Sequence, residues 1–360
     1  MITILISNRN NAFPLPPIGG FARQSPLGIH SPLPRNRVME QAANRNTVYS
    51  EIHIGDHANM GDRTTQLRCV WDGAAELGEG VFWHAAEQAV YWVDIFQSNL
   101  HCLHSDGSSQ SWHFPGQISA AVPCDSGGLL ATLQYGLAHL DLTTGTVTPL
   151  LELESELPDN RFNDGCSDSR GQFWFCSMDI KQQDPSGCFY RMDHSGEVHP
   201  LPSFGQMSVT NGPAFSTDGQ WVYFTDTLGK KVYRAGLDDA GLPGEPALYL
   251  DFADEDGFPD GMCTDTSGGL WVCHFSGGRV TRFYNGKADQ VIELPVPNVT
   301  KCAFGGVNLS TLYITTATTA LDEEQRRQCP LSGGLFAIDV PFQGVGMGTA
   351  SRATGWARRA

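Results

Sequence analysis

The sequence predicts an all-β protein, a six-bladed β-propeller with a central channel. A repeated unit carries this prediction, and its clearest copy spans residues 258–283: a Pro-Asp-Gly triplet, a turn at Asp-Thr-Ser-Gly-Gly, and a strand-like Leu-Trp-Val-Cys. Six such units are anchored on their second strands at Trp92, Leu130, Trp174, Tyr223, Trp271 and Tyr313, with spacings of 38, 44, 49, 48 and 42 residues. A loose period of roughly 40–50 residues with two or more short strands per unit is typical of a propeller.

The composition agrees with this fold and excludes several function classes. Glycine accounts for 40 of the 360 residues, and only 17% are charged, against the usual value of roughly 25%. Many turns and a large buried β-core explain both values. The net charge of −16 argues against a nucleic-acid partner, because a phosphate backbone needs a basic surface. No window of about 20 apolar residues exists, so the sequence predicts no membrane span.

The ten cysteines include no CxxC pair, and several lie inside strand patterns, where a free cysteine behaves as a small buried hydrophobe. We therefore expect reduced thiols and a cytoplasmic protein, without a zinc–thiolate site.

Three segments differ in composition. Residues 1–66 are rich in Asn, Pro, Arg and Ser and show no strand alternation, which predicts a disordered extension or a mis-assigned start, with Met39 or Met60 as the true start. Residues 67–342 hold the propeller, and residues 343–360 are expected to form a loose C-terminal tail.

Within the propeller, the blades are assigned in order from apolar hairpins and turn signals. They are expected at residues 69–105, 111–148, 161–192, 209–237, 258–294 and 299–340. Because the last blade of a propeller is often completed by strands from both chain ends, residues 335–340 are expected to pair with residues 66–71.

One position recurs at the start of each unit, directly before a glycine or its equivalent. Its occupants in the six blades are Glu79, Ser119, Asp164, Asn211, Asp260 and Lys301. The innermost strands of a propeller face its channel, so equivalent positions form a ring of side chains at one mouth. Convergent carboxylate and amide oxygens suit a hard divalent cation. The alternative is that Asp-Gly and Asn-Gly are ordinary turn dipeptides, but the equivalence across blades and the glutamate in blade one favour the ring.

An ordered set of motifs resembles the gluconolactonase / senescence-marker-protein (regucalcin-like) family. They are LGEG at 77–80, RFNDG at 161–165, TNGPAFS at 210–216, FTDT at 224–227, FPDGM at 258–262 and CAFGG at 302–306. The resemblance covers residues 71–340, approximately the whole predicted propeller. It implies a six-bladed propeller that binds one divalent metal cation (calcium, zinc, manganese or magnesium) and hydrolyses sugar lactones.

The same resemblance implies roles for individual residues. Glu79, Asn211 and Asp260 are the implied metal ligands, and Asp260 is also the implied general base. Arg161 and Asn163 match positions that hold substrate hydroxyls. The family pattern thus points Asn163 inward and leaves Asp164 structural, in contrast to the alignment on turns.

Three other channel candidates have weaker support. Ser119 and Lys301 are expected to line the channel, where Lys301 lies near the cation at a Coulomb cost or meets substrate oxygens. His274 faces the channel or, as lone histidines more often do, belongs to the core or surface.

We expect a metal-dependent hydrolase that opens a sugar (aldono-)lactone to the aldonic acid in carbohydrate catabolism. A divalent ion polarises the lactone carbonyl, while an adjacent carboxylate moves the proton of water. No GxSxG elbow offers a serine-based alternative. Two other functions stay open, a promiscuous metal-dependent esterase and a calcium-binding propeller with a non-catalytic regulatory or binding role.

Overall fold

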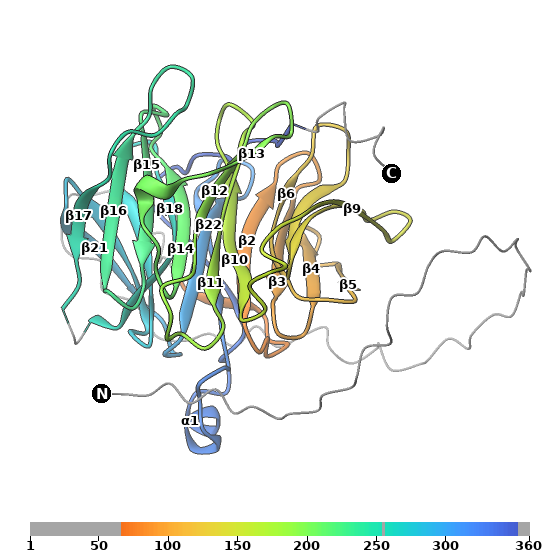
Figure 1. Cartoon of the computed structure of the whole chain (residues 1–360). Helices are drawn as coiled ribbons and strands as arrows, with labels where there is room; N and C mark the ends of the chain where they lie inside the picture. The colour runs from red at the N-terminus through yellow and green to blue at the C-terminus, as the bar shows by residue number, and fades with distance from the viewer. Residues whose placement is uncertain (1–65, 254–255, 352–360) are drawn as a thin grey trace, which may run out of the picture. The chain divides into compact units, whose positions relative to one another are not determined.

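The computed structural model of the chain describes residues 66–253 and 256–351. Residues 1–65, for which an extension or mis-assigned start is predicted, and residues 352–360 lie outside the described part. The described residues form six four-stranded antiparallel sheets arranged as the blades of a propeller (Figure 1). The predicted all-β fold with six blades is therefore confirmed.

The innermost strand of each blade contacts the innermost strands of both neighbouring blades, which closes the propeller around its axis. In chain order these strands are β2 (Gly78–His84), β6 (Ile118–Pro123), β10 (Asn160–Ser167), β14 (Thr210–Phe215), β18 (Phe258–Thr264) and β22 (Val299–Gly305). The second strands carry the six repeat anchors. They are β3 (Ala89–Asp94), β7 (Leu129–Leu133), β11 (Phe173–Asp179), β15 (Trp221–Asp226), β19 (Leu270–Phe275) and β23 (Thr311–Thr316).

The third and fourth strands complete each sheet outward. The third strands are β4 (Asn99–His104), β8 (Gly136–Asp141), β12 (Phe189–Met192), β16 (Lys231–Gly236), β20 (Arg279–Tyr284) and β24 (Leu335–Asp339). The outermost strands are β5 (Ser109–His113), β9 (Thr146–Glu152), β13 (Val198–Pro200), β17 (Ala247–Asp251), β21 (Lys287–Glu293) and β1 (Arg68–Trp71).

Buried aspartates explain why the repeated hairpins form. In blade five, Asp265 Oδ1 accepts hydrogen bonds from the amides of Ser267 (2.9 Å) and Gly269 (3.0 Å), and Oδ2 accepts one from the Trp271 indole (2.8 Å). One carboxylate thus fixes both the turn and the large side chain at the start of the second strand. Asp168 and Trp174 repeat this arrangement at the same spacing in blade three.

The core is divided into layers between neighbouring blades. Phe82 and Leu100 of blade one, for example, pack in one apolar cluster with Ile118 and Ala131 of blade two. Because each layer is shared by two blades, no blade buries its apolar faces alone, and the inner strands are held at fixed positions around the axis.

The propeller is closed by strands from both ends of the described chain. β1 pairs antiparallel with β24, with Arg68 opposite Ala337, Cys69 opposite Phe336 and Trp71 opposite Leu335. This confirms the predicted pairing of residues 66–71 with residues 335–340. It also assigns the strand at Arg68–Trp71 to blade six, so blade one begins at Gly78 and not at Cys69.

The outermost strands were the hardest to recognise from sequence. Blade one contains a fourth strand at Ser109–His113, part of which was expected to open blade two, and blade four contains a fourth strand at Ala247–Asp251. Most of the β5 side chains are exposed to solvent, so β5 lacks the alternating apolar pattern that marks a half-buried strand.

Residues 343–351 were expected to form a loose tail, but they hydrogen-bond to loops at the ends of the blades. The Gly344 amide donates to Leu309 O (2.7 Å), and the Ala350 amide donates to Pro123 O (2.8 Å). Glycine permits this approach, because a Cβ at Gly344 would lie 2.0 Å from Phe304 Cβ and one at Gly348 would lie 2.0 Å from Asp168 O.

Two short helices complete the described part, the 3-10 helix η1 (Pro202–Phe204) and α1 (Glu323–Gln328). α1 lies in the connection between β23 and β24, at the end of the propeller where the inner strands begin (Figure 1). Within residues 66–253 and 256–351, no helix has the length and apolarity required to cross a bilayer.

The closure of blade six is tested by truncation. A chain that starts at residue 73 lacks β1 and Leu67, which is 5% exposed, whereas a chain that starts at residue 66 keeps both. We expect the shorter chain to melt several degrees lower, because burial of one leucine is worth about 2 kcal/mol and each kcal/mol shifts Tm by roughly 2–4 °C. Equal melting temperatures in calorimetry would show that β1 adds nothing to the closure.

Candidate active site in the central channel

Every inner strand loses register with the second strand of its blade near its beginning. The shifts fall between Glu79 and Phe82, Ile118 and Ala120, Phe162 and Asp164, Asn211 and Ala214, Pro259 and Met262, and Val299 and Cys302. Such bulges redirect side chains away from the regular alternation of a strand. The six residues expected to form a ring at the channel mouth lie at these six bulges. The positions aligned from sequence are therefore also equivalent positions in the six blades of the structure.

A chain of hydrogen bonds joins the polar residues of blades three and four. Arg161 Nη1 donates to Asn163 Oδ1 (2.7 Å), and Asn163 Nδ2 donates to Asn211 Oδ1 (2.9 Å). Asn211 Nδ2 in turn donates to Thr227 Oγ1 (3.0 Å). The structure thus brings together three of the predicted site residues, each at most 5% exposed.

Glu79 and Asp260 are buried close enough to influence each other's ionisation. Burial, followed by the charge of Asp164, raises the pKa of Glu79 from 4.5 to about 8. Burial and the charge of Glu79 raise the pKa of Asp260 well above its ordinary value. Burial lowers the pKa of Arg161 to about 10, an effect that the charges of Glu79 and Asp260 partly oppose. Two carboxylates and one guanidinium therefore share one electrostatic environment.

The carboxylate of Asp260 is incompletely satisfied. Its Oδ1 atom is buried and has no hydrogen-bond partner within the described structure. A buried acceptor without a partner is costly, and native proteins generally keep one only where it serves a role. Glu79 and Asp260 offer carboxylate oxygens, and Asn211 offers an amide oxygen while its Nδ2 donates to Thr227; oxygen is the ligand type that hard divalent cations prefer. These three residues therefore fit a divalent cation.

Lys301 and Asp164 form a buried ion pair that connects blade six to blade three, on opposite sides of the propeller. The lysine amine donates to Asp164 Oδ1, and the amide of Gly212 donates to Oδ2 (3.0 Å). Gly261 leaves room for the lysine, because a Cβ there would lie 2.6 Å from Lys301 Cγ. Lys301 lies in the channel as expected, but its ammonium is bound by Asp164.

Burial tends to lower the pKa of Lys301, but the charge of Asp164 outweighs this effect and raises it. Lys301 therefore stays protonated. Asp164 binds this ammonium and the amide of Gly212, which agrees with the structural role expected for Asp164.

Two other predicted candidates use their polar atoms elsewhere. Ser119 Oγ lies 2.8 Å from Thr132 Oγ1 of the neighbouring strand, so this hydroxyl is engaged inside blade two. His274 Nδ1 lies 2.8 Å from Asp256 O, and the imidazole packs against Phe252 with 4.9 Å between ring centroids. His274 is 2% exposed, which corresponds to the core alternative, although its Nε2 has no hydrogen-bond partner among the described residues.

Phe96 was not among the residues selected from the motifs. The guanidinium carbon of Arg161 lies 5.8 Å from the centroid of its ring. Phe96 lies in the turn between β3 and β4, outside every motif that marked the site, and only the folded ring of blades brings it beside blade three. Thr227, in contrast, belongs to the FTDT motif, although its contact with Asn211 was not anticipated.

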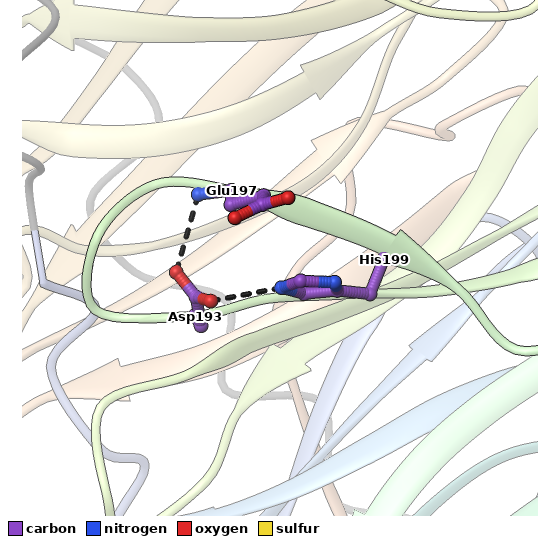
Figure 2. A group of neighbouring side chains, drawn as sticks. All are labelled: Asp193, Glu197 and His199. Atoms are coloured by element: carbon purple, nitrogen blue, oxygen red, sulfur yellow. Dashed lines mark hydrogen bonds and ion pairs between the residues drawn. The ribbon is translucent and has the colours of Figure 1, made fainter.

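A second group of potential metal ligands lies away from the channel, on the hairpin between β12 and β13. Asp193, Glu197 and His199 place one ligand atom each within 4.8 Å of one another (Figure 2). Asp193 already accepts hydrogen bonds from the Ser195 amide (2.8 Å), the Glu197 amide (3.2 Å) and His199 Nε2 (2.8 Å). These contacts are those of a tight turn, which explains the cluster without a metal.

Comparison with known proteins identifies the family. Residues 77–318 match the family described as SMP-30/Gluconolactonase/LRE-like region. The chain belongs to this family. The motif resemblance is therefore confirmed.

Two curated relatives are named as lactonases. The chain is 35% identical to a 6-deoxy-6-sulfogluconolactonase of Pseudomonas putida, over 77% of this chain and 96% of that protein. It is 32% identical to an L-arabinolactonase of Azospirillum brasilense, over 78% of this chain and 94% of that protein. These relatives support the classification of this chain as a lactone-hydrolysing hydrolase.

A solved structure of the same family agrees. The calcium-binding protein regucalcin from Agrobacterium tumefaciens superimposes with a TM-score of 0.75 and 30% identity, covering 79% of this chain and 96% of that one.

The ion pair across the channel is tested by a double-mutant cycle. Asp164→Asn or Lys301→Met alone leaves one buried charge uncompensated, and such changes cost about 3–5 kcal/mol of unfolding free energy. The double variant removes both charges, so we expect it to regain at least half of the summed loss. Urea denaturation in the presence of a chelator measures all four proteins, and costs that simply add would show that the two charges do not interact.

Proposed function

We propose that this protein hydrolyses a sugar (aldono-)lactone to the corresponding aldonic acid, with one divalent cation held by Glu79, Asn211 and Asp260. The observation that supports this most strongly is the buried, unpartnered Oδ1 of Asp260, which lies beside a second buried carboxylate. The relatives named as lactonases support the same reaction.

Charge compensation supports the cation. Glu79 and Asp260 repel each other, while the ammonium of Lys301 is already paired with Asp164. A divalent ion between the two carboxylates would satisfy Asp260 Oδ1 and offset both charges. When bound there, such a cation would supply Lewis acidity toward the lactone carbonyl.

The chain's own residues supply orientation and proton transfer. A guanidinium has five N–H donors. Within the described residues, Arg161 donates through Nη1 to Phe162 O and Asn163 Oδ1, so donors on its other nitrogens can bind substrate oxygens. Asn163 is fixed between Arg161 and Asn211 and sets the position of both. The Asp260 carboxylate takes a proton from the attacking water and returns it to the ring oxygen as the lactone opens.

A non-catalytic calcium-binding role is the second candidate, favoured by the description of the regucalcin relative as a calcium-binding protein. Both functions use the same three ligands, and only the first requires Asp260 to move a proton. A cytoplasmic location also remains our proposal, supported by ten free cysteines.

The ligand set is tested by matched carboxylate-to-amide substitutions. We expect Asp260→Asn to lower kcat for lactone hydrolysis by about 10²–10⁴-fold, the usual contribution of a general base. Glu79→Gln should weaken the calorimetric binding of the activating cation. Asp193→Asn is the control. It should change neither kcat nor cation binding, because the contacts of Asp193 with Glu197 and His199 are those of a turn.

If Asp193→Asn loses cation binding while Glu79→Gln keeps it, the proposed ligands are wrong. Weaker cation binding by Glu79→Gln, with no lactone hydrolysed by the parent protein, would favour the calcium-binding role.

The raised pKa of Glu79 predicts a pH dependence. Without a cation, the folded protein holds this proton up to a pH of about 8, whereas the unfolded chain releases it near 4.5. The contribution of Glu79 to stability therefore falls as pH rises from 4.5 to 8. Cation binding requires the ionised form, so the cation-induced rise in Tm should be larger at pH 8 than at pH 6.

Scanning calorimetry with and without cation at both pH values measures this difference. Glu79→Gln should reduce the difference between the two pH values. A cation-induced shift in Tm that is the same at both pH values would contradict the assignment of Glu79 as a ligand.

A further inference from the structure

A cavity is lined by Lys301 and by residues that follow the candidate site along the inner strands. It has a volume of about 100 Å³, and its lining includes Lys301 but not Glu79, Asn211 or Asp260. The later residues of the inner strands and the segment Val345–Met347 form its walls. The exposed residues Ser169 and Thr217 also belong to the lining, so solutes can enter from solvent. A cavity of this size holds several water molecules, and hence a molecule as small as a peroxide.

Three cysteines line this cavity, and two of them are close neighbours. The sulfur atoms of Cys263 and Cys302 lie 3.5 Å apart, although the residues belong to different blades, on β18 and β22. Cys263 is partly exposed, while Cys302 is 1% exposed. The third thiol, Cys166, instead donates to Pro213 O at 3.1 Å. The cavity wall therefore contains one thiol pair and one isolated thiol.

The surroundings favour a thiolate within the pair. Burial acts to raise the pKa of Cys302, but hydrogen bonds from the thiols of Cys263 and Cys273 and the charge of Lys301 outweigh it and lower the pKa to about 5. The thiolate is the form that reacts with oxidants. Cys302 meets solutes only through the cavity that it lines, and a thiolate beside a second thiol is the arrangement found in redox-sensitive cysteines.

We propose that Cys263 and Cys302 are an oxidation site at which a peroxide forms a disulfide between blades five and six. The first sulfur attacks one peroxide oxygen, the O–O bond breaks, and a sulfenic acid and water result. The second thiol then attacks the sulfenic sulfur, the S–O bond breaks, and a second water leaves. The two thiols lose two protons and two electrons, and one peroxide is reduced to two waters.

The two sulfur atoms lie close enough to form a disulfide because their strands are neighbours. β18 and β22 are in contact along the channel, and the sulfur atoms already face each other across the boundary between the blades. The two atoms need to approach by about 1.5 Å to reach a disulfide bond of about 2.05 Å. Cys166 has no thiol within bonding contact among the described residues, so its oxidation would stop at the sulfenic acid or proceed further.

The test treats the reduced full-length protein with increasing hydrogen peroxide, alkylates the remaining thiols and maps the peptides without reduction. The first product is expected to lose two hydrogens and to contain a crosslink between Cys263 and Cys302, with the other eight of the ten cysteines alkylated. Reductant should restore the starting mass. First oxidation at any other cysteine, or sulfinic acid at this pair without a crosslink, would overturn the proposal.

Cys166→Ser and Cys302→Ser form a matched pair of variants. Both remove one thiol from the same cavity wall, and only the second removes a partner of the pair. The crosslink is expected to form at the parental rate in Cys166→Ser and to be lost in Cys302→Ser. A Cys302→Ser variant that retains the two-hydrogen loss would contradict the assignment. If circular dichroism shows that this variant does not fold, the crosslink map of the parent protein decides alone.

Discussion

The burial of two like charges at the mouth of one channel is the constraint on which the site depends. Glu79 and Asp260 come from blades one and five, each is at most 6% exposed, and burial together with mutual repulsion opposes their ionisation. Uncompensated buried charges cost several kcal/mol each. The structure supplies Arg161 nearby and pairs Lys301 with Asp164. In our proposal, a divalent cation neutralises the two carboxylates.

The propeller makes this convergence possible through six register shifts. Each shift lies near the start of an inner strand, so side chains from distant parts of the sequence turn toward one axis. The Lys301–Asp164 pair joins opposite blades, and Lys301 also lines the cavity that contains the thiols. Closure by β1 and β24 fixes the blades that carry all of these residues.

The fold and the equivalent positions at the inner-strand bulges could be predicted from sequence, because buried strands and turn dipeptides leave strong local patterns. The anchors Trp174 and Trp271 are almost fully buried and were evident at once. The outer strand Ser109–His113 was not, because its exposed polar side chains resemble a loop. The pairing of Lys301 with Asp164 was also hidden, since no local pattern encodes a contact between residues 137 positions apart. The same limit applies to Phe96 beside Arg161.

The most direct test of the central claim locates the cation itself. Crystals of the protein soaked with Mn²⁺ give an anomalous difference map that shows every bound ion. The account predicts a strong peak within coordination distance of Glu79, Asn211 and Asp260, which disappears in Glu79→Gln crystals. A peak only at Asp193, Glu197 and His199, or an empty channel in protein that hydrolyses a lactone in the presence of chelator, would contradict it.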